Sequence, residues 1–151
     1  MPLIKRLGPG DETLLELLAI EESDFDLEGR GSPLRPLDVQ AARSYLNNAS
    51  VLHWAAFEED AVIGHLYCIL LPLRAIPGQE LLLYEIGVRR KWRKRGVGRA
   101  LLLHMENWMR ENDVPTVWVL ADNPSAVDFY RACDFAQDVE DPLYMMRDLS
   151  P

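Results

Sequence analysis

The sequence predicts a single α/β domain with a mixed sheet, in which an antiparallel meander precedes a parallel strand–helix–strand unit. Strand-like runs with short connections fill the middle of the chain, from residue 51 to residue 88. Residues 81–135 then alternate strand and helix patterns, which is typical of a parallel crossover. The 151 residues contain no internal repeat or linker, so we expect one domain over residues 1–151.

The start of the chain predicts a short strand and a helix. The strand covers Leu3 to Leu7 and ends at the turn residues Gly8-Pro9-Gly10. Asp11 is suited to cap the following helix, because an Asp side chain accepts hydrogen bonds from the first free amides of a helix. One apolar face of this helix is made by Leu14, Leu17 and Leu18.

A long loop and a second helix follow. Ser23 to Pro36 is acidic and interrupted by glycines and prolines, so we expect a loop of about a dozen residues, a length that is often functional. Apolar residues return at helical spacing from about Leu37 to Asn48. The inward face of that helix is expected to be made by Val39, Ala42 and Leu46.

The remaining elements give a total of about six or seven strands and about four helices. The meander strands are Val51 to Phe57, Val62 to Leu71 and Leu81 to Val88. The parallel unit and the end of the chain are expected to contain a helix at Val97 to Arg110, a buried strand at Thr116 to Ala121, a helix at Pro124 to Ala132 and a closing strand at Leu143 to Leu149.

Composition narrows the class of partner. Sixteen Lys and Arg residues stand against 24 Asp and Glu residues, a net charge of −8, which disfavours a nucleic-acid protein and favours a cationic small molecule. Cys68 and Cys133 have no partner spacing, which argues against a disulfide framework or a zinc site. No apolar run is long enough for a membrane span, so a cytoplasmic protein is expected. A homodimer is left open.

The densest functional signal is the run Arg93-Lys94-Arg95-Gly96-Val97-Gly98-Arg99, between a predicted strand and a predicted helix. A helix N-terminus offers unpaired amides and the positive end of the helix dipole, and glycines allow a ligand to approach the backbone closely. This pattern predicts an anion site suited to phosphates. The alternative from the residues alone is a basic turn before a helix.

Three motifs in order resemble the GNAT family of N-acetyltransferases: Glu85-Ile86-Gly87-Val88, then Arg93-x-x-Gly96-x-Gly98, then Asp122 to Tyr130. The resemblance covers about Val51 to Leu149. It implies that acetyl-CoA lies between the strand ending at Val88 and the strand ending at Ala121, without a metal. The resemblance further places the pyrophosphate on Arg93, Lys94, Arg95, Gly96, Val97, Gly98 and Arg99, the pantetheine on the backbone of Ile86 and Val88, and the cofactor beside Asn123.

Two residues are candidates for catalysis. Glu85 interrupts an apolar strand, where partial burial would raise its pKa and suit it to take a proton from an ammonium; the alternative is a satisfied charge at a strand edge. In the family pattern, Tyr130 points at the cofactor sulfur and can donate a proton to the departing thiolate; the alternative is core packing. We expect His53, His65 and His104 to be core or interface residues.

Within the family, the chain looks most like the aminoglycoside 3-N-acetyltransferases, on Trp54 to Phe57, Ala61 to Gly64 and Leu83 to Val88. This implies acetyl transfer to a primary amine of a polycationic small molecule. The alternatives are another amine, such as a polyamine, an amino acid or a protein N-terminus, or an acyl-CoA-binding module without activity. Besides Glu85, the candidates for an acidic amine site are Asp122 and the less specific Asp24, Asp26, Glu28, Asp138, Glu140 and Asp141.

Overall fold

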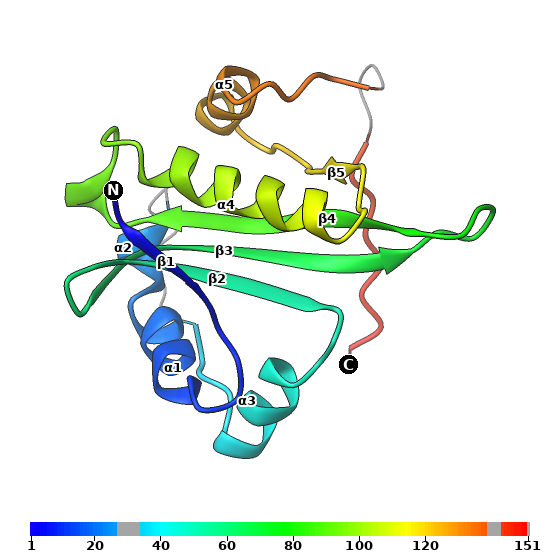
Figure 1. The fold of residues 1–151 in the computed structure, drawn as a ribbon. Coiled ribbons are helices and arrows are strands. Elements are labelled where there is room, and N and C mark those ends of the chain that lie inside the picture. The colour runs from blue at the N-terminus through cyan, green and yellow to red at the C-terminus, as the bar shows by residue number, and fades with distance from the viewer. Residues whose placement is uncertain (27–33, 139–142, 151) are drawn as a thin grey trace. The chain divides into compact units, whose positions relative to one another are not determined.

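The computed structural model describes residues 1–26, 34–138 and 143–150 (Figure 1). The chain forms two compact units, Met1–Leu120 and Ala121–Pro151. In the described residues, the first unit contains a five-stranded sheet with four α-helices, and the second contains one α-helix. None of the described helices combines the length and the apolar character that a membrane crossing requires.

The sheet confirms the predicted mixed α/β class. Its strands follow the order of the chain, and each of the first three pairs antiparallel with the next, whereas the fifth pairs parallel with the fourth. The parallel pair is joined through a helix, as a crossover connection requires. The strands are β1 (Leu3–Arg6), β2 (Val51–Glu58), β3 (Ala61–Pro72), β4 (Gln79–Val88) and β5 (Val117–Trp118).

Helices cover both faces of this sheet (Figure 1). On one face lies α4 (Val97–Glu111), whose Met105 meets Cys68 of β3 with a sulfur–sulfur distance of 3.7 Å. On the other face lie α1 (Glu12–Ile20), α2 (Glu22–Phe25) and α3 (Val39–Leu46). Their buried cluster with the sheet contains Leu7, Leu18, Phe25, Leu46, Ala55 and Val62. A 3₁₀ turn, Arg90–Trp92, precedes α4, and α5 (Pro124–Ala132) belongs to the second unit.

A β-bulge interrupts β4. Glu85 is opposite Tyr67 of β3, but the next pair joins Leu83 to Cys68, so Tyr84 is an extra residue in β4. Before the bulge, Leu83 is fully buried. After it, Glu85 and Gly87 point to the face that α2 covers, since Gly87 lies against Phe25. Among the described residues β5 pairs with β4 only at Leu81 and Leu82, so the part of β4 beyond the bulge is not paired with β5.

Three expected elements differ from the structure. Residues 143–149 form no strand; Leu143 is 84% exposed there, so its apolar residues have no covering face in the described chain. The expected strand Thr116 to Ala121 is reduced to β5, and Leu120 is 56% exposed, so that run is not covered on both faces. The expected loop Ser23 to Pro36 begins inside α2, because buried Phe25 anchors a helical turn; residues 27–33 lie outside the described chain.

Gly87 tests the packing of α2 on β4. A Cβ at this position would lie 2.9 Å from Cβ of Phe25 and 3.1 Å from the Phe25 carbonyl oxygen. We expect Gly87→Ala to lower the free energy of unfolding by about 1–3 kcal/mol, because backbone must shift to make room. Gly8→Ala is the matched control, since a Cβ there meets nothing within 4 Å. Urea denaturation of both variants checks this. An equal free energy of unfolding for Gly87→Ala and Gly8→Ala would show that α2 moves away from β4 at no cost.

Candidate active site

Glu85 is the carboxylate at the centre of the site. It follows the bulge in β4 and is half-buried on the face that α2 covers. Burial, followed by the nearby Glu22 carboxylate of α2, raises its pKa to about 7, because burial and a second negative charge both disfavour ionisation. A carboxyl group with this pKa changes protonation state near neutral pH, which is the property expected of a general base.

Aromatic side chains surround Glu85 on the sheet. Tyr67 is its partner across the strands, and the rings of Tyr67 and Tyr84 meet edge to face at 5.4 Å between centroids. Burial raises the pKa of Tyr67, and the charge of Glu85 adds to this rise. Tyr45 of α3 lies against the same ring, with its centroid 5.5 Å from that of Tyr67. The rings of Tyr67 and Tyr45 thus lie on the face of the sheet that carries Glu85.

A buried hydrogen-bonded chain continues from Tyr45. The Tyr45 hydroxyl is 2.8 Å from Nδ1 of His53, and Nε2 of His53 is 2.9 Å from Nδ1 of His65. Burial lowers the pKa of His53 well below its ordinary value and lowers the pKa of His65 to about 4, so both rings are neutral at pH 7. The expectation that these two histidines are core residues is confirmed, whereas His104 is exposed on α4.

The N-terminus of α4 has the features of an anion site. Gly96 is its N-cap residue, in a left-handed conformation with φ of 84°, and no side chain caps the helix. The preceding Lys94 also has a positive φ, of 59°. Alternating backbone conformations of this kind turn successive amides toward one point, where the helix dipole favours negative charge. A Cβ on Gly96 would meet nothing within 4 Å, so there is open space beside this backbone.

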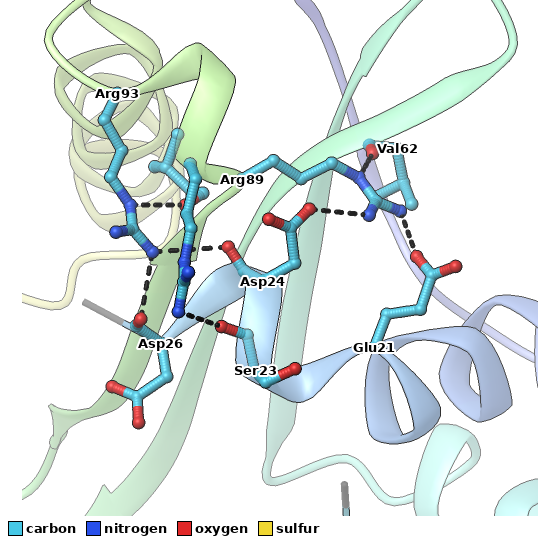
Figure 2. Close-up of polar contacts among 9 residues, drawn as sticks. Glu21, Ser23, Asp24, Asp26, Val62, Arg89 and Arg93 are labelled. Carbon is cyan, nitrogen blue, oxygen red and sulfur yellow. Dashed lines mark hydrogen bonds and ion pairs between the residues drawn. The ribbon is translucent and has the colours of Figure 1, made fainter. Parts of the chain in front are cut away.

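The side chain of Arg93, which begins this motif, contacts the end of β4 and residues 24 and 26 (Figure 2). Arg93 donates to the carbonyl oxygen of Val88 at 3.0 Å, and one of its terminal nitrogens donates to the carbonyls of Asp24 at 3.2 Å and Asp26 at 2.9 Å. Its backbone amide donates to the carbonyl of Arg90 at 3.3 Å. Both the side chain and the amide of Arg93 therefore have protein partners. The side chains of Lys94, Arg95 and Arg99 are exposed at the loop.

The other expected cofactor residues divide between the two units. Ile86 and Val88 lie in the part of β4 that has no pairing with β5 in the described chain, where an extended ligand could be added; the Val88 carbonyl already accepts from Nε of Arg93. In the second unit, Asn123 caps α5 by accepting from the amide of Ala126 at 2.8 Å, and its Nδ2 donates to Asp122 at 3.2 Å.

Tyr130 is buried in the second unit, with 7% of its surface exposed. Its ring lies 5.4 Å from that of Phe129 and 5.3 Å from that of Phe135, measured between centroids. The packing role considered for Tyr130 is therefore present.

The acidic candidates have different surroundings. Asp24 forms an ion pair with Arg89 at 3.1 Å, so the charge of its carboxylate is paired within the protein. Asp138 is exposed, and Glu28, Glu140 and Asp141 lie outside the described residues. Glu22 could not be assigned to the site from the sequence, because its proximity to Glu85 depends on helix α2, which has no sequence pattern that predicts it. Within residues 1–26, 34–138 and 143–150, no group of three or more His, Cys, Asp or Glu side chains could hold a metal.

Comparison with known proteins relates this arrangement to one family. The family model described as "Acetyltransferase (GNAT) family" matches residues 14–135. No curated protein matches the chain.

Solved structures share the fold. The aminoglycoside acetyltransferase meta-AAC0020 from an uncultured soil metagenomic sample, in complex with trehalose, is 21% identical with a TM-score of 0.79 over 97% of each chain. It was also solved in complex with sisomicin. The aminoglycoside acetyltransferase HMB0005, from an uncultured soil metagenomic sample, is 22% identical with a TM-score of 0.81 over 99% of each chain. Ribosomal-protein-alanine N-acetyltransferase from Brucella melitensis biovar Abortus 2308 is 16% identical with a TM-score of 0.74, over 98% of this chain and 99% of that chain.

The buried histidines predict a specific dependence of stability on pH. Because His65 has a pKa of about 4 in the folded chain, the unfolded chain binds this proton more tightly, and stability is lost as the pH falls below about 6.5. We expect the wild type to lose about 3 kcal/mol relative to a His53→Leu/His65→Leu variant between pH 6.5 and pH 4. Glu85 is present in both proteins, so its opposite contribution cancels. Parallel denaturation curves at each pH test this; identical pH profiles would contradict it.

Proposed function

Because the chain belongs to the acetyltransferase (GNAT) family, we propose that it transfers the acetyl group of acetyl-CoA to a primary amine of a polycationic small molecule. The observation that carries this proposal is Glu85, a half-buried carboxylate with a pKa of about 7 beside the strand edge that β5 leaves unpaired in the described chain. The transfer takes place directly between the two substrates in a ternary complex.

Glu85 acts as the general base. An amine is an ammonium at neutral pH, and only its neutral form has a lone pair that can attack a thioester. The ionised carboxylate attracts the ammonium and accepts its proton, directly or through one water. The nearby Glu22 adds negative charge to the same place, so the two carboxylates together favour a cationic acceptor.

The residues present fit acetyl-CoA, which supplies the acetyl group as a thioester. The uncapped amides at the start of α4 and the exposed Lys94, Arg95 and Arg99 would hold the pyrophosphate. The edge of β4 at Ile86 and Val88, which β5 leaves unpaired in the described chain, would bind the pantetheine by strand addition, with the Val88 carbonyl shared with Arg93. From the family pattern we assign Asn123 to the cofactor and the Tyr130 hydroxyl to proton donation toward the departing thiolate. A buried ring is compatible with that role because packing fixes the direction of the hydroxyl.

For the acceptor we propose an aminoglycoside antibiotic, acetylated at the 3-amino position. Aminoglycosides carry several ammonium groups, and the chain has a net charge of −8. Two of the similar solved structures are described as aminoglycoside acetyltransferases, and their fold extends over nearly the whole chain. Asp122 is assigned to the same amine site from the sequence. This function predicts a contribution to antibiotic resistance.

A screen of thiol release from acetyl-CoA separates this acceptor from the alternatives. The amines are sisomicin, spermidine, free amino acids and a peptide with an N-terminal alanine. We expect the fastest release with sisomicin, with the product acetylated at the 3-amino group by NMR. Activity on spermidine or the peptide alone would retain the acetyltransferase and discard the aminoglycoside. Tight binding of acetyl-CoA without release for any amine would favour a binding module.

Glu85→Gln tests the base. The amide keeps the size of the side chain but cannot accept the proton, so we expect kcat/KM for the amine to fall about a hundredfold, at the low end for a positioned base. In the wild type kcat/KM should rise with pH through about 7, since the base must be ionised, and the variant should lack this rise. Glu58→Gln, at an exposed position of β2, is the matched control. A profile unchanged by Glu85→Gln would remove the base assignment.

Gly96→Val tests the phosphate site. A branched side chain would project into the open space beside the α4 amides and would strain a backbone with φ of 84°. We expect the affinity for CoA to fall by more than tenfold, or about 1.4 kcal/mol. Gly10→Val is the control, because Gly10 has a similar backbone, with φ of 105°, at a distant turn. Calorimetry that finds equal CoA affinity in the two folded variants would place the pyrophosphate elsewhere.

A further inference from the structure

Three arginines that follow β4 bind a segment far away in the sequence (Figure 2). We call residues 21–26, which include helix α2, the α2 segment. Arg89 pairs with the carboxylates of Glu21 and Asp24, and its Nε donates to the carbonyl of Val62 at 2.6 Å. Arg90 reaches the carbonyl of Ser23 at 3.4 Å. The α2 segment is thus attached along its length to the stretch between β4 and α4.

Arg93 makes the contacts at the C-terminal end of this segment. The carbonyls of Asp24 and Asp26 both accept from one terminal nitrogen of Arg93, while Nε of Arg93 donates to the carbonyl of Val88. Backbone carbonyls near the end of a helix carry partial negative charge, which suits a guanidinium. These bonds join three elements: the end of β4, the α2 segment and the loop that leads into α4.

The α2 segment also forms part of the surroundings of Glu85. It carries Glu22, whose charge contributes to the raised pKa of Glu85. It also carries Phe25, which is 1% exposed and packs edge to face against His65 of the sheet. The guanidinium of Arg89 lies over the Phe25 ring at 4.5 Å. The position of this segment therefore affects both the charge and the hydration at Glu85.

We propose that Arg93 is a positioning residue that couples the two substrate sites, so that CoA bound at the start of α4 orders the α2 segment beside Glu85. This rests on the proposed function, because it takes the uncapped amides of residues 94–99 as the phosphate site. It changes the role of Arg93 from the phosphate ligand expected from the sequence to a link with the amine site. The link acts through the short loop that separates Arg93 from Gly96.

The distinction between ligand and link follows from the contacts. A guanidinium that binds phosphate must leave its present acceptors, which are partly buried carbonyls, and those carbonyls would lose their charged donor. The exposed Lys94 and Arg95 can meet a phosphate without leaving buried carbonyl acceptors. Bound CoA restricts the loop, and a restricted loop holds Arg93, which in turn restricts the α2 segment. By linkage, an ordered α2 segment also favours CoA.

Hydrogen exchange tests the coupling without knowledge of the amine. The proteins are the wild type, Arg93→Gln and the control Lys91→Gln, which removes an equal charge from an exposed residue of the 3₁₀ turn before Arg93. CoA is the probe, and its affinity is measured by calorimetry on each protein. Exchange at residues 21–26 is then followed with and without saturating CoA. Arg93→Lys is the second variant should Arg93→Gln unfold, since it keeps the charge but loses the forked geometry.

We expect CoA to slow exchange at residues 21–26 at least fivefold in the wild type and in Lys91→Gln, and to leave it unchanged in Arg93→Gln. Arg93→Gln should bind CoA within about threefold of Lys91→Gln. Equal slowing in all three proteins, or none in a wild type that binds CoA, would overturn the coupling and leave the proposed function intact. A loss of CoA affinity above tenfold in Arg93→Gln alone would make Arg93 a phosphate ligand. A wild type that does not bind CoA would refute both proposals.

Discussion

The extra residue in β4 determines how the rest of the site is arranged. Side chains alternate between the two faces of a sheet, so one additional residue at Tyr84 changes which side chains of the strand face α4. Without the extra residue, Leu83 and Glu85 would lie on the same face of the sheet, because they are two positions apart. With it, Leu83 is buried on one face and Glu85 lies on the face that α2 covers. Pairing of β4 with β5 ends at Leu82, just before the bulge, in the described chain. The bulge thus places a carboxylate beside an available strand edge.

The properties of Glu85 come from the elements that cover it. A carboxylate on an open strand would have an ordinary pKa, because water would stabilise its charge. Here α2 and the aromatic residues of β3 and α3 exclude water, and Glu22 adds a second negative charge. Neutral His53 contacts Tyr45 of α3, and neutral His65 contacts Phe25 of α2. Arg89 and Arg93 bind the α2 segment through an ion pair and backbone hydrogen bonds. The apolar packing and the ion pairs therefore act together on one titrating group.

Periodicity in the sequence was sufficient to predict the larger elements. The meander strands and helices α4 and α5 have strong patterns and well-defined ends, and the structure places them within a few residues of the expected bounds. The bulge was not predictable, because its signal is a single polar residue, Glu85, in an apolar run. Helix α2 was missed because it has only four residues, two of them acidic, and its stability comes from burial of Phe25. The apolar pattern of Leu143 to Leu149 predicted a strand, but the structure describes no partner strand for it.

Side-chain roles were less predictable than elements. The motif that begins at Arg93 indicated an anion site, and the uncapped start of α4 agrees with it. The direction of the Arg93 side chain depends on where residues 24 and 26 lie in space, which no local pattern encodes. The histidines were expected in the core on grounds of apolar neighbours. Their hydrogen bond to one another arises from the register of β2 and β3, which places His53 opposite Tyr67 and His65 two residues away.

The proposed role of Glu85 depends on a pKa near neutrality. The most direct measurement is an NMR titration of the side-chain carboxyl carbons in protein labelled with ¹³C-glutamate, with Glu85→Gln used to assign the Glu85 signal. We expect a midpoint at about pH 7. A midpoint near the ordinary glutamate value of about 4.3 would contradict this role, because a fully ionised carboxylate of low basicity could not be a base tuned to neutral pH.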